Sequence, residues 1–229
     1  MYKILLVCLA AFSFFAPQAR AQGVEAEVDL FELHAGKGDE HFVFDSTFTA
    51  GGDLHGVALK VEGGSDVGPR IDDVTAQLLY TFAPAEGTSL LAGVRRDFRG
   101  GADMNYATLV IVQDFGELLS AEHFLYLSEH GDLTGAAQVV ASLPLGPALQ
   151  IEPRAAMGWA AREIPAEETG SGITDVELSL RLRQAIGPVL NVYIGAIHER
   201  LVGGTADIAI ANGDRSHVTR AVFGAGFSF

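Results

Sequence analysis

The end of the chain alternates with a period of two residues, where positions 217–229 read HVTRAVFGAGFSF. From Thr219 onward the odd positions carry three phenylalanines, whereas the even positions include Arg220 and Ser228. Such alternation predicts a β-strand with one apolar face. The pattern fits the closing strand of a β-barrel, and the alternative is the edge strand of a soluble sandwich.

The same alternation recurs along the chain and predicts eleven further strands of roughly ten residues. The twelve expected strands span 26–35, 40–50, 54–63, 71–83, 88–98, 105–115, 118–129, 133–143, 148–162, 174–184, 189–202 and 217–229. Pro153 is a weak point, because proline cannot donate to a strand ladder. Connections after even-numbered strands are short, whereas several after odd-numbered strands are longer; the longest loops are expected at 164–172 and 203–216.

Composition favours a membrane barrel over a soluble fold. Hydrophobic residues make up 48% of the chain and the mean hydropathy is +0.25, yet after residue 21 no apolar run reaches the length of about 18 residues that a spanning helix needs. Apolar side chains facing lipid and polar side chains facing the interior explain both facts. The chain is therefore expected to be all-β, a closed antiparallel up-and-down transmembrane β-barrel of about twelve strands. The alternating loop lengths place it in the outer membrane with both termini periplasmic.

The first 21 residues have the pattern of a signal peptide. Lys3 precedes an apolar run, and the small-x-small sequence Ala19-Arg20-Ala21 follows it. The run is too short for a membrane anchor. We expect residues 1–21 to be the signal peptide and 22–229 to be one barrel domain. Cys8, the single cysteine, would leave with the signal.

Charge excludes one class of partner. Removal of Lys3 and Arg20 from the 15 basic residues leaves 13 against 29 acidic residues, a net charge of −16. Such a chain is not expected to bind nucleic acid. The expected partners are outer-membrane lipid, cations and the machinery that assembles outer-membrane barrels.

Several segments, in order along nearly the whole mature chain, are similar to the copper resistance protein B (CopB) family. They are LFE at 30–32, KVEG at 60–63, AGVRRDFR at 92–99, LSEHGD at 127–132, QIEPR at 150–154, GSGITDVEL at 170–178, ER at 199–200 and GGTAD at 203–207. The resemblance implies an outer-membrane barrel of copper resistance or homeostasis. Such a barrel binds copper ions, or aids their passage across or exclusion from the outer membrane, and periplasmic copper proteins are its implied partners.

One departure from the family bears on copper sequestration. Family members often carry a Met/His-rich segment ahead of the barrel, whereas only residues 22–25 separate the expected cleavage site from the first strand here, and the mature chain retains only Met104 and Met157. A small-solute or cation channel without copper specificity is the first alternative, and a structural or adhesive barrel is the second. No enzyme is expected, because no Gly-x-Ser-x-Gly motif occurs and Ser128 near His130 lacks an orienting third group.

Three histidines are the candidate copper ligands. A hairpin loop at 36–39 would set His34 directly across from His41, and directly opposed side chains lie close enough to share a metal. His217, at the outer end of the strand that closes the barrel, is expected near them. Imidazole and carboxylate oxygen suit copper(II). An ordinary polar pair at a wet rim is the alternative.

Charged residues at inward positions are the second candidate constellation. They are Glu32, Asp45, Lys60, Glu62, Asp73, Arg95, Asp97, Glu122, Arg154, Asp175, Glu177, Arg181, Arg183 and Glu199. A lining rich in acids would favour cations. The alternative is a mutual ion-pair network that fills the lumen, since acids and bases interleave as pairs would.

Overall fold

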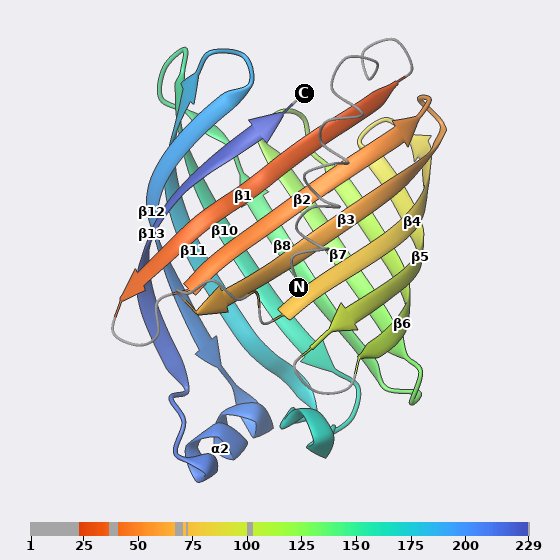
Figure 1. Cartoon of the computed structure of the whole chain (residues 1–229), viewed down its shortest axis with the longest axis vertical. Coiled ribbons are helices and arrows are strands. Elements are labelled where there is room, and N and C mark those ends of the chain that lie inside the picture. The colour runs from red at the N-terminus through yellow and green to blue at the C-terminus, as the bar shows by residue number, and fades with distance from the viewer. Residues whose placement is uncertain (1–22, 37–40, 67–70, 72, 100–102, 229) are drawn as a thin grey trace.

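A computed structural model describes residues 23–36, 41–66, 71, 73–99 and 103–228. These residues form one antiparallel sheet with a short helix at one end (Figure 1). The strands are β1 (Val24–Gly36), β2 (His41–Gly51), β3 (His55–Asp66), β4 (Asp73–Ala85), β5 (Thr88–Phe98), β6 (Met104–Asp114), β7 (Leu119–Ser128), β8 (Leu133–Ala141), β9 (Leu143–Pro144), β10 (Leu149–Ala160), β11 (Gly172–Ile186), β12 (Leu190–Leu201) and β13 (His217–Ser228). The expected signal peptide lies outside the described residues.

The sheet closes on itself. Strand β13 pairs with β1, for example through Leu33 and Phe223, and also with β12. Strand β10 pairs with both β8 and β11, which completes the circle. The two-residue strand β9 prolongs the line of β8 along β10, so the described chain crosses the barrel twelve times. The expectation of a closed antiparallel barrel of about twelve strands is confirmed.

Pro153 sits where the ladder is interrupted. On one side it pairs with Leu180 of β11. On the other side the pairing of β10 passes from Leu143 of β9 to Val140 of β8 and skips the position opposite Pro153. A residue without an N–H is tolerated there because no ladder bond is required of it.

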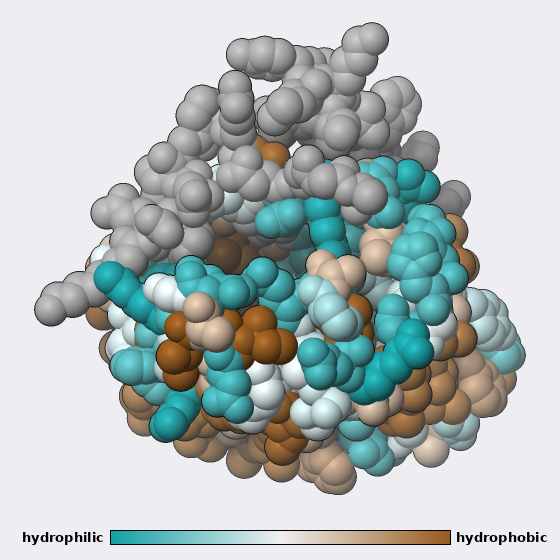
Figure 2. Space-filling model, turned by 90° about the horizontal axis from the view of Figure 1, so that it is seen from below, coloured by the Kyte–Doolittle hydropathy of each residue, from teal (hydrophilic) through white to brown (hydrophobic). Residues whose placement is uncertain are grey.

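The two faces of the sheet differ in chemistry. Leu178 and Val94 are each 60% exposed on the outer face, whereas Glu32, Gln77 and Arg181 are almost wholly buried on the inner face. Figure 2, a view onto the end that carries the helix, shows a largely hydrophilic end face with hydrophobic residues along the visible flank. An apolar exterior around a polar interior is the arrangement that a lipid bilayer stabilises.

The interior is not polar throughout, however. Ala58, Leu79, Val110 and Phe124 form a buried apolar cluster on the inner face, an exception within the polar lumen that the alternation predicts. Leu79, Val110 and Phe124 lie near the middle of β4, β6 and β7, and Ala58 lies in the first third of β3. The cluster therefore fills part of the lumen where a wide pore would need water.

The two ends of the barrel differ in their connections. Short connections join the strands at 52–54, 86–87, 115–118, 145–148 and 187–189; those at the opposite end are 37–40, 67–72, 99–103, 129–132, 161–171 and 202–216. We call the second end the long-loop mouth. The C-terminus lies at the other end (Figure 1).

The two longest connections contain helical structure, where only loops were expected. Residues 203–216 include helix α2 (Gly203–Asn212), and 161–171 include the 3₁₀ turn η2 (Pro165–Glu167). A helix of ten residues is too short to show a periodic apolar stripe and is marginal alone. Contacts with the neighbouring loop support it, because Thr205 Oγ1 accepts a 2.9 Å bond from the N–H of Gly170. Within the described part of the chain, no helix is both long and apolar enough to cross a membrane.

Candidate functional site: the charged lumen

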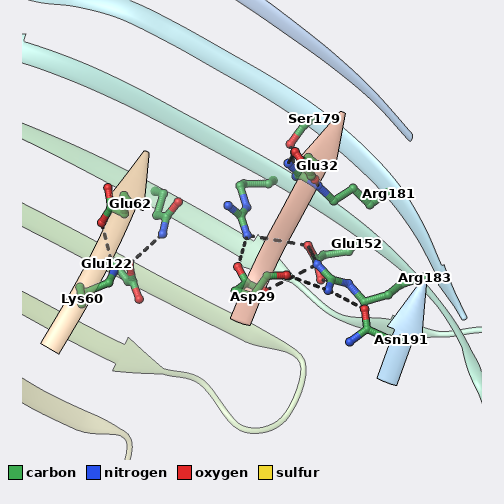
Figure 3. Close-up of polar contacts among 12 residues, drawn as sticks. Asp29, Glu32, Lys60, Glu62, Glu122, Glu152, Ser179, Arg181, Arg183 and Asn191 are labelled. Atoms are coloured by element: carbon green, nitrogen blue, oxygen red, sulfur yellow. Dashed lines mark hydrogen bonds and ion pairs between the residues drawn. The ribbon is translucent and has the colours of Figure 1, made fainter. Parts of the chain in front are cut away.

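The most buried ion pair spans the lumen wall between β1 and β11. The Arg181 guanidinium donates to both carboxylate oxygens of Glu32, from Nε at 2.6 Å and from Nη2 at 3.2 Å. It also donates to Ser179 Oγ at 2.8 Å. Strands β12 and β13 separate the two partners in the sheet, and Figure 3 shows the side chains meeting over that gap. Glu32 also lies 2.8 Å from Nε2 of His34.

A second network lies beside the first and centres on Arg183. Its guanidinium contacts Glu152 at 3.2 Å, donates to Asn191 at 2.9 Å and stacks over the Tyr193 ring at 4.3 Å. Asp29 lies 3.7 Å from Arg183 and 3.3 Å from Arg154 of β10 (Figure 3).

Asp29 and Glu152 are missing from the charges expected in the lumen. Strand β1 carries a bulge between Val28 and Phe31, which breaks the period of two and turns Asp29 toward the arginines. The alternation of β1 gave no sign of this bulge. Glu152, by contrast, shares the phase of Arg154, so the pattern of β10 was sufficient to identify it.

A third group surrounds Lys60 on β3. Its ammonium lies 3.8 Å from Glu62 and 5.4 Å from the Phe124 ring centre on β7, so the side chain reaches across the lumen. Gln77 donates to Glu62 at 3.2 Å, and Gln138 donates to Glu122 at 2.7 Å.

A fourth group lies near the long-loop mouth. Asp97 accepts hydrogen bonds from Arg95 at 2.6 Å and from Arg99 at 2.9 Å. Arg99 also pairs with Glu167 of η2 at 3.1 Å, which ties the 161–171 connection to β5. Burial alone would lower the pKa of Arg99, but the hydrogen bond to Asp97 and the nearby charges, that of Glu167 among them, together outweigh it and raise the pKa. Next to this group is a cavity of about 230 Å³, lined in part by Tyr106, Glu167 and Asp175.

The remaining expected charges divide into inner and rim positions. Glu199 pairs with Arg220 of β13, a lumenal arginine that was not among the expected charges. Glu177 lies within electrostatic range of Arg181. Asp73 opens β4 at the long-loop mouth and is exposed.

His217 does not join the other two candidate histidines on the inner face. His34 is buried on the inner face, and His41 is its direct partner in the register of β1 and β2, as expected; the His41 side chain lies outside the described part. His217 belongs instead to the outer face, where its ring lies 6.3 Å from that of His198. The odd positions of β13 all face outward, so an imidazole at 217 cannot share the face of Glu32. Among the described residues, no three His, Cys, Asp or Glu side chains are grouped to hold a metal.

Comparison with known families settles the relationship of this chain. The sequence model of the family described as copper resistance protein B precursor (CopB) matches residues 23–229. The chain belongs to this family. Two CopB relatives are the copper resistance protein B homolog of Pseudomonas syringae pv. tomato, 26% identical over 196 residues, and copper resistance protein B of Escherichia coli, 28% identical over 203 residues. They cover 86% and 87% of this chain, which spans 66% of each relative's length.

Solved structures show the same architecture. The NanC porin matches with a TM-score of 0.56 at 11% identity, covering 89% of this chain and 98% of its own. The KdgM porin matches with a TM-score of 0.50 at 10% identity, covering 90% and 98%. Identities this low support the fold alone. Together with the CopB family, they place this barrel in the outer membrane.

Proposed function

We propose that this CopB-family barrel binds copper ions at the lumenal wall near its long-loop mouth, and that this binding is its contribution to copper resistance. The observation that carries the proposal is the buried His34–Glu32 contact, with His41 directly opposite His34 in the register. A carboxylate that holds one ring nitrogen of a histidine orients the other nitrogen for a metal. Nδ1 of His34 makes no hydrogen bond to any described residue.

The donor chemistry fits copper(II) as a cargo. Imidazole nitrogen and carboxylate oxygen are ligands that copper(II) accepts. An ion that must also leave its site does not need a full set of protein ligands around it. His34 supplies an imidazole nitrogen, and Glu32 is the carboxylate that holds this ring in place. The mature chain has no cysteine and few methionines, so thiolate and thioether ligands contribute little.

Binding is favoured over free passage because the middle of the lumen is occupied. The apolar cluster around Leu79 and Phe124 lies on one side, and the Arg181 and Arg183 networks lie on the other. An open channel for small solutes would need a continuous water path through these side chains. We therefore infer that the long-loop mouth binds copper ions that reach it from one side of the membrane. The protein's role in copper resistance would then be binding and not catalysis.

The orientation follows from the connections. In outer-membrane barrels the longer loops face the cell exterior and the short turns face the periplasm. Because β1 begins and β13 ends at the short-turn end, the copper-binding mouth would face outward, and periplasmic copper proteins would meet the opposite end.

Replacement of both register-paired histidines by alanine is expected to reduce copper(II) affinity about 100-fold or more. Loss of a group that merely orients a ligand typically costs about 10–100-fold, and these two residues would be ligands. Copper titration of the purified barrel, followed by visible and electron paramagnetic resonance spectra, measures this loss.

The matched control is a double variant of two outward-facing histidines, His123→Ala with His198→Ala. It should bind copper as the unaltered protein does. Failure of the unaltered protein to bind stoichiometric copper would remove the lumenal copper site, and equal losses in both double variants would assign binding to the outer surface.

Conductance in planar bilayers tests the occupied lumen. The barrel is expected to conduct far less than an open porin of similar strand number, because ion pairs and an apolar cluster fill its middle. Large, steady single-channel steps would instead support the channel without copper specificity.

A further inference from the structure

Two carboxylates face each other on neighbouring strands with too little positive charge between them. Asp45 of β2 and Glu62 of β3 are direct partners in the register, so both project from the same inner face. Like charges directly opposite each other on a sheet are destabilising. The basic group that acts most strongly on Asp45 is Lys60, one inward position from Glu62 on β3, and the charges of Asp45, Glu62 and Glu122 all act on it.

Lys60 compensates this charge poorly. Its ammonium is 3.8 Å from Glu62, beyond ordinary hydrogen-bond length, and it makes no hydrogen bond with any described residue. Part of its stabilisation comes from the Phe124 ring, 5.4 Å away. One ammonium therefore serves several carboxylates without bonding closely to any of them (Figure 3).

Two oxygen atoms without a hydrogen-bond donor belong to the residues around Lys60. Oδ1 of Asp45 and Oε1 of Gln77 are both buried and have no hydrogen-bond partner. Gln77 is only 1% exposed, pairs with Lys60 across β3 and β4, and donates through Nε2 to Glu62. Its amide oxygen thus belongs to the group and lacks a donor. Buried acceptors without a donor are rare and call for a ligand, ion or water.

We propose that Asp45, Glu62 and the Gln77 amide oxygen form a lumenal site for a hard divalent cation of the Ca²⁺ or Mg²⁺ type, for which the Lys60 ammonium is a tethered competitor. Such cations take oxygen ligands and complete their coordination with water, so two carboxylates and one amide suffice. Histidine and methionine are absent from these contacts, which separates this site from the copper-binding wall at His34. The inference goes beyond the proposed copper function and does not depend on it.

The test is calcium binding by the full-length barrel, purified in detergent and stripped with chelator, measured by isothermal titration calorimetry. Lys60→Met keeps most of the length of the side chain and removes its charge. We expect this variant to bind one Ca²⁺ at least about tenfold more tightly than the unaltered protein, because a competing unit charge a few ångströms away is worth more than that factor in a protein interior. Adding Glu62→Gln to Lys60→Met should abolish the gain.

The control adds Glu86→Gln, in the β4–β5 turn, to Lys60→Met, and it should keep the tighter binding. Fluorescence of Trp159 verifies that each variant is folded. Calcium affinity of Lys60→Met no greater than that of the unaltered protein would overturn the proposal, as would a gain that survives Glu62→Gln. Copper titration of the same variants should be unchanged, so failure of this site and failure of the copper site give different results.

Discussion

Replacement of Arg181 by methionine is expected to lower the free energy of unfolding by about 3–5 kcal/mol, because it leaves the Glu32 carboxylate buried without its guanidinium. Arg181 is 2% exposed and Glu32 is 1% exposed, so water cannot replace the lost partner. His34, which also contacts Glu32, offers at most one hydrogen bond. Urea titration of the barrel in phospholipid vesicles, read from Trp159 fluorescence, measures the change.

The same substitution at Arg96 is the matched control. Arg96 also pairs with an acid, Asp103 at 2.7 Å, but its side chain is 49% exposed. An exposed pair contributes about 0–1 kcal/mol, so Arg96→Met should be nearly silent. Adding Glu32→Met to Arg181→Met should recover much of the loss, since the uncompensated charge is then gone. Equal effects of the two single variants would show that the lumen around Arg181 is wetter than its burial indicates.

The alternation of apolar and polar residues predicted most of the fold, because each strand of a membrane barrel has lipid on one side and a polar interior on the other. β11 is the clearest case, with Leu178, Leu180 and Leu182 outward and Arg181 inward, as expected. Closure followed once the strands were placed in lipid, since the last strand cannot leave its backbone N–H and C=O groups unpaired there, and β1 provides the partner. Helix α2 was not predicted from the sequence, because contacts with the neighbouring connection stabilise it and its own residues show no helical periodicity.

Ion pairs between strands that are not neighbours in the sheet could not be predicted from the sequence. Arg95 and Asp97 pair within one strand, two residues apart, which is local information. Arg181 has an acid, Glu177, on its own strand, yet its hydrogen-bonded partner is Glu32, 149 residues away. Which side chains meet across a lumen depends on strand tilt and stagger, and these are properties of the closed barrel, not of any one strand.

The histidines illustrate the same limit. The register of His34 and His41 followed from the length of one hairpin connection, which is local information. The prediction that His217 lies near them was wrong, because the alternation of β13 places position 217 on the outer face of the sheet. Thr219, Ala221 and Phe223 face outward, and His217 shares their parity. The register also sets His34 opposite Val222, five residues from His217, so these two imidazoles differ in position along the strands as well as in face.

Replacement of Leu178 by arginine is expected to cost about 2–4 kcal/mol of stability in a bilayer, because a charge on the lipid face near the midplane must be moved into hydrocarbon. Leu178 lies near the middle of β11 and is 60% exposed on the outer face. In a soluble protein a leucine this exposed would accept arginine at almost no cost. The size of the loss in stability therefore shows whether lipid or water surrounds Leu178.

Leu145 is the matched control, since it is 59% exposed but lies in the short connection between β9 and β10. At the membrane surface the penalty for arginine falls to about 0–1 kcal/mol, so Leu145→Arg should unfold nearly as the unaltered protein does. Urea titration in phospholipid vesicles measures both variants. The difference between them should grow with the acyl-chain length of the lipid, because thicker hydrocarbon places Leu178 further from water. If both variants are neutral in vesicles, the outer face of β11 does not contact lipid, and the membrane-spanning arrangement of the barrel is wrong.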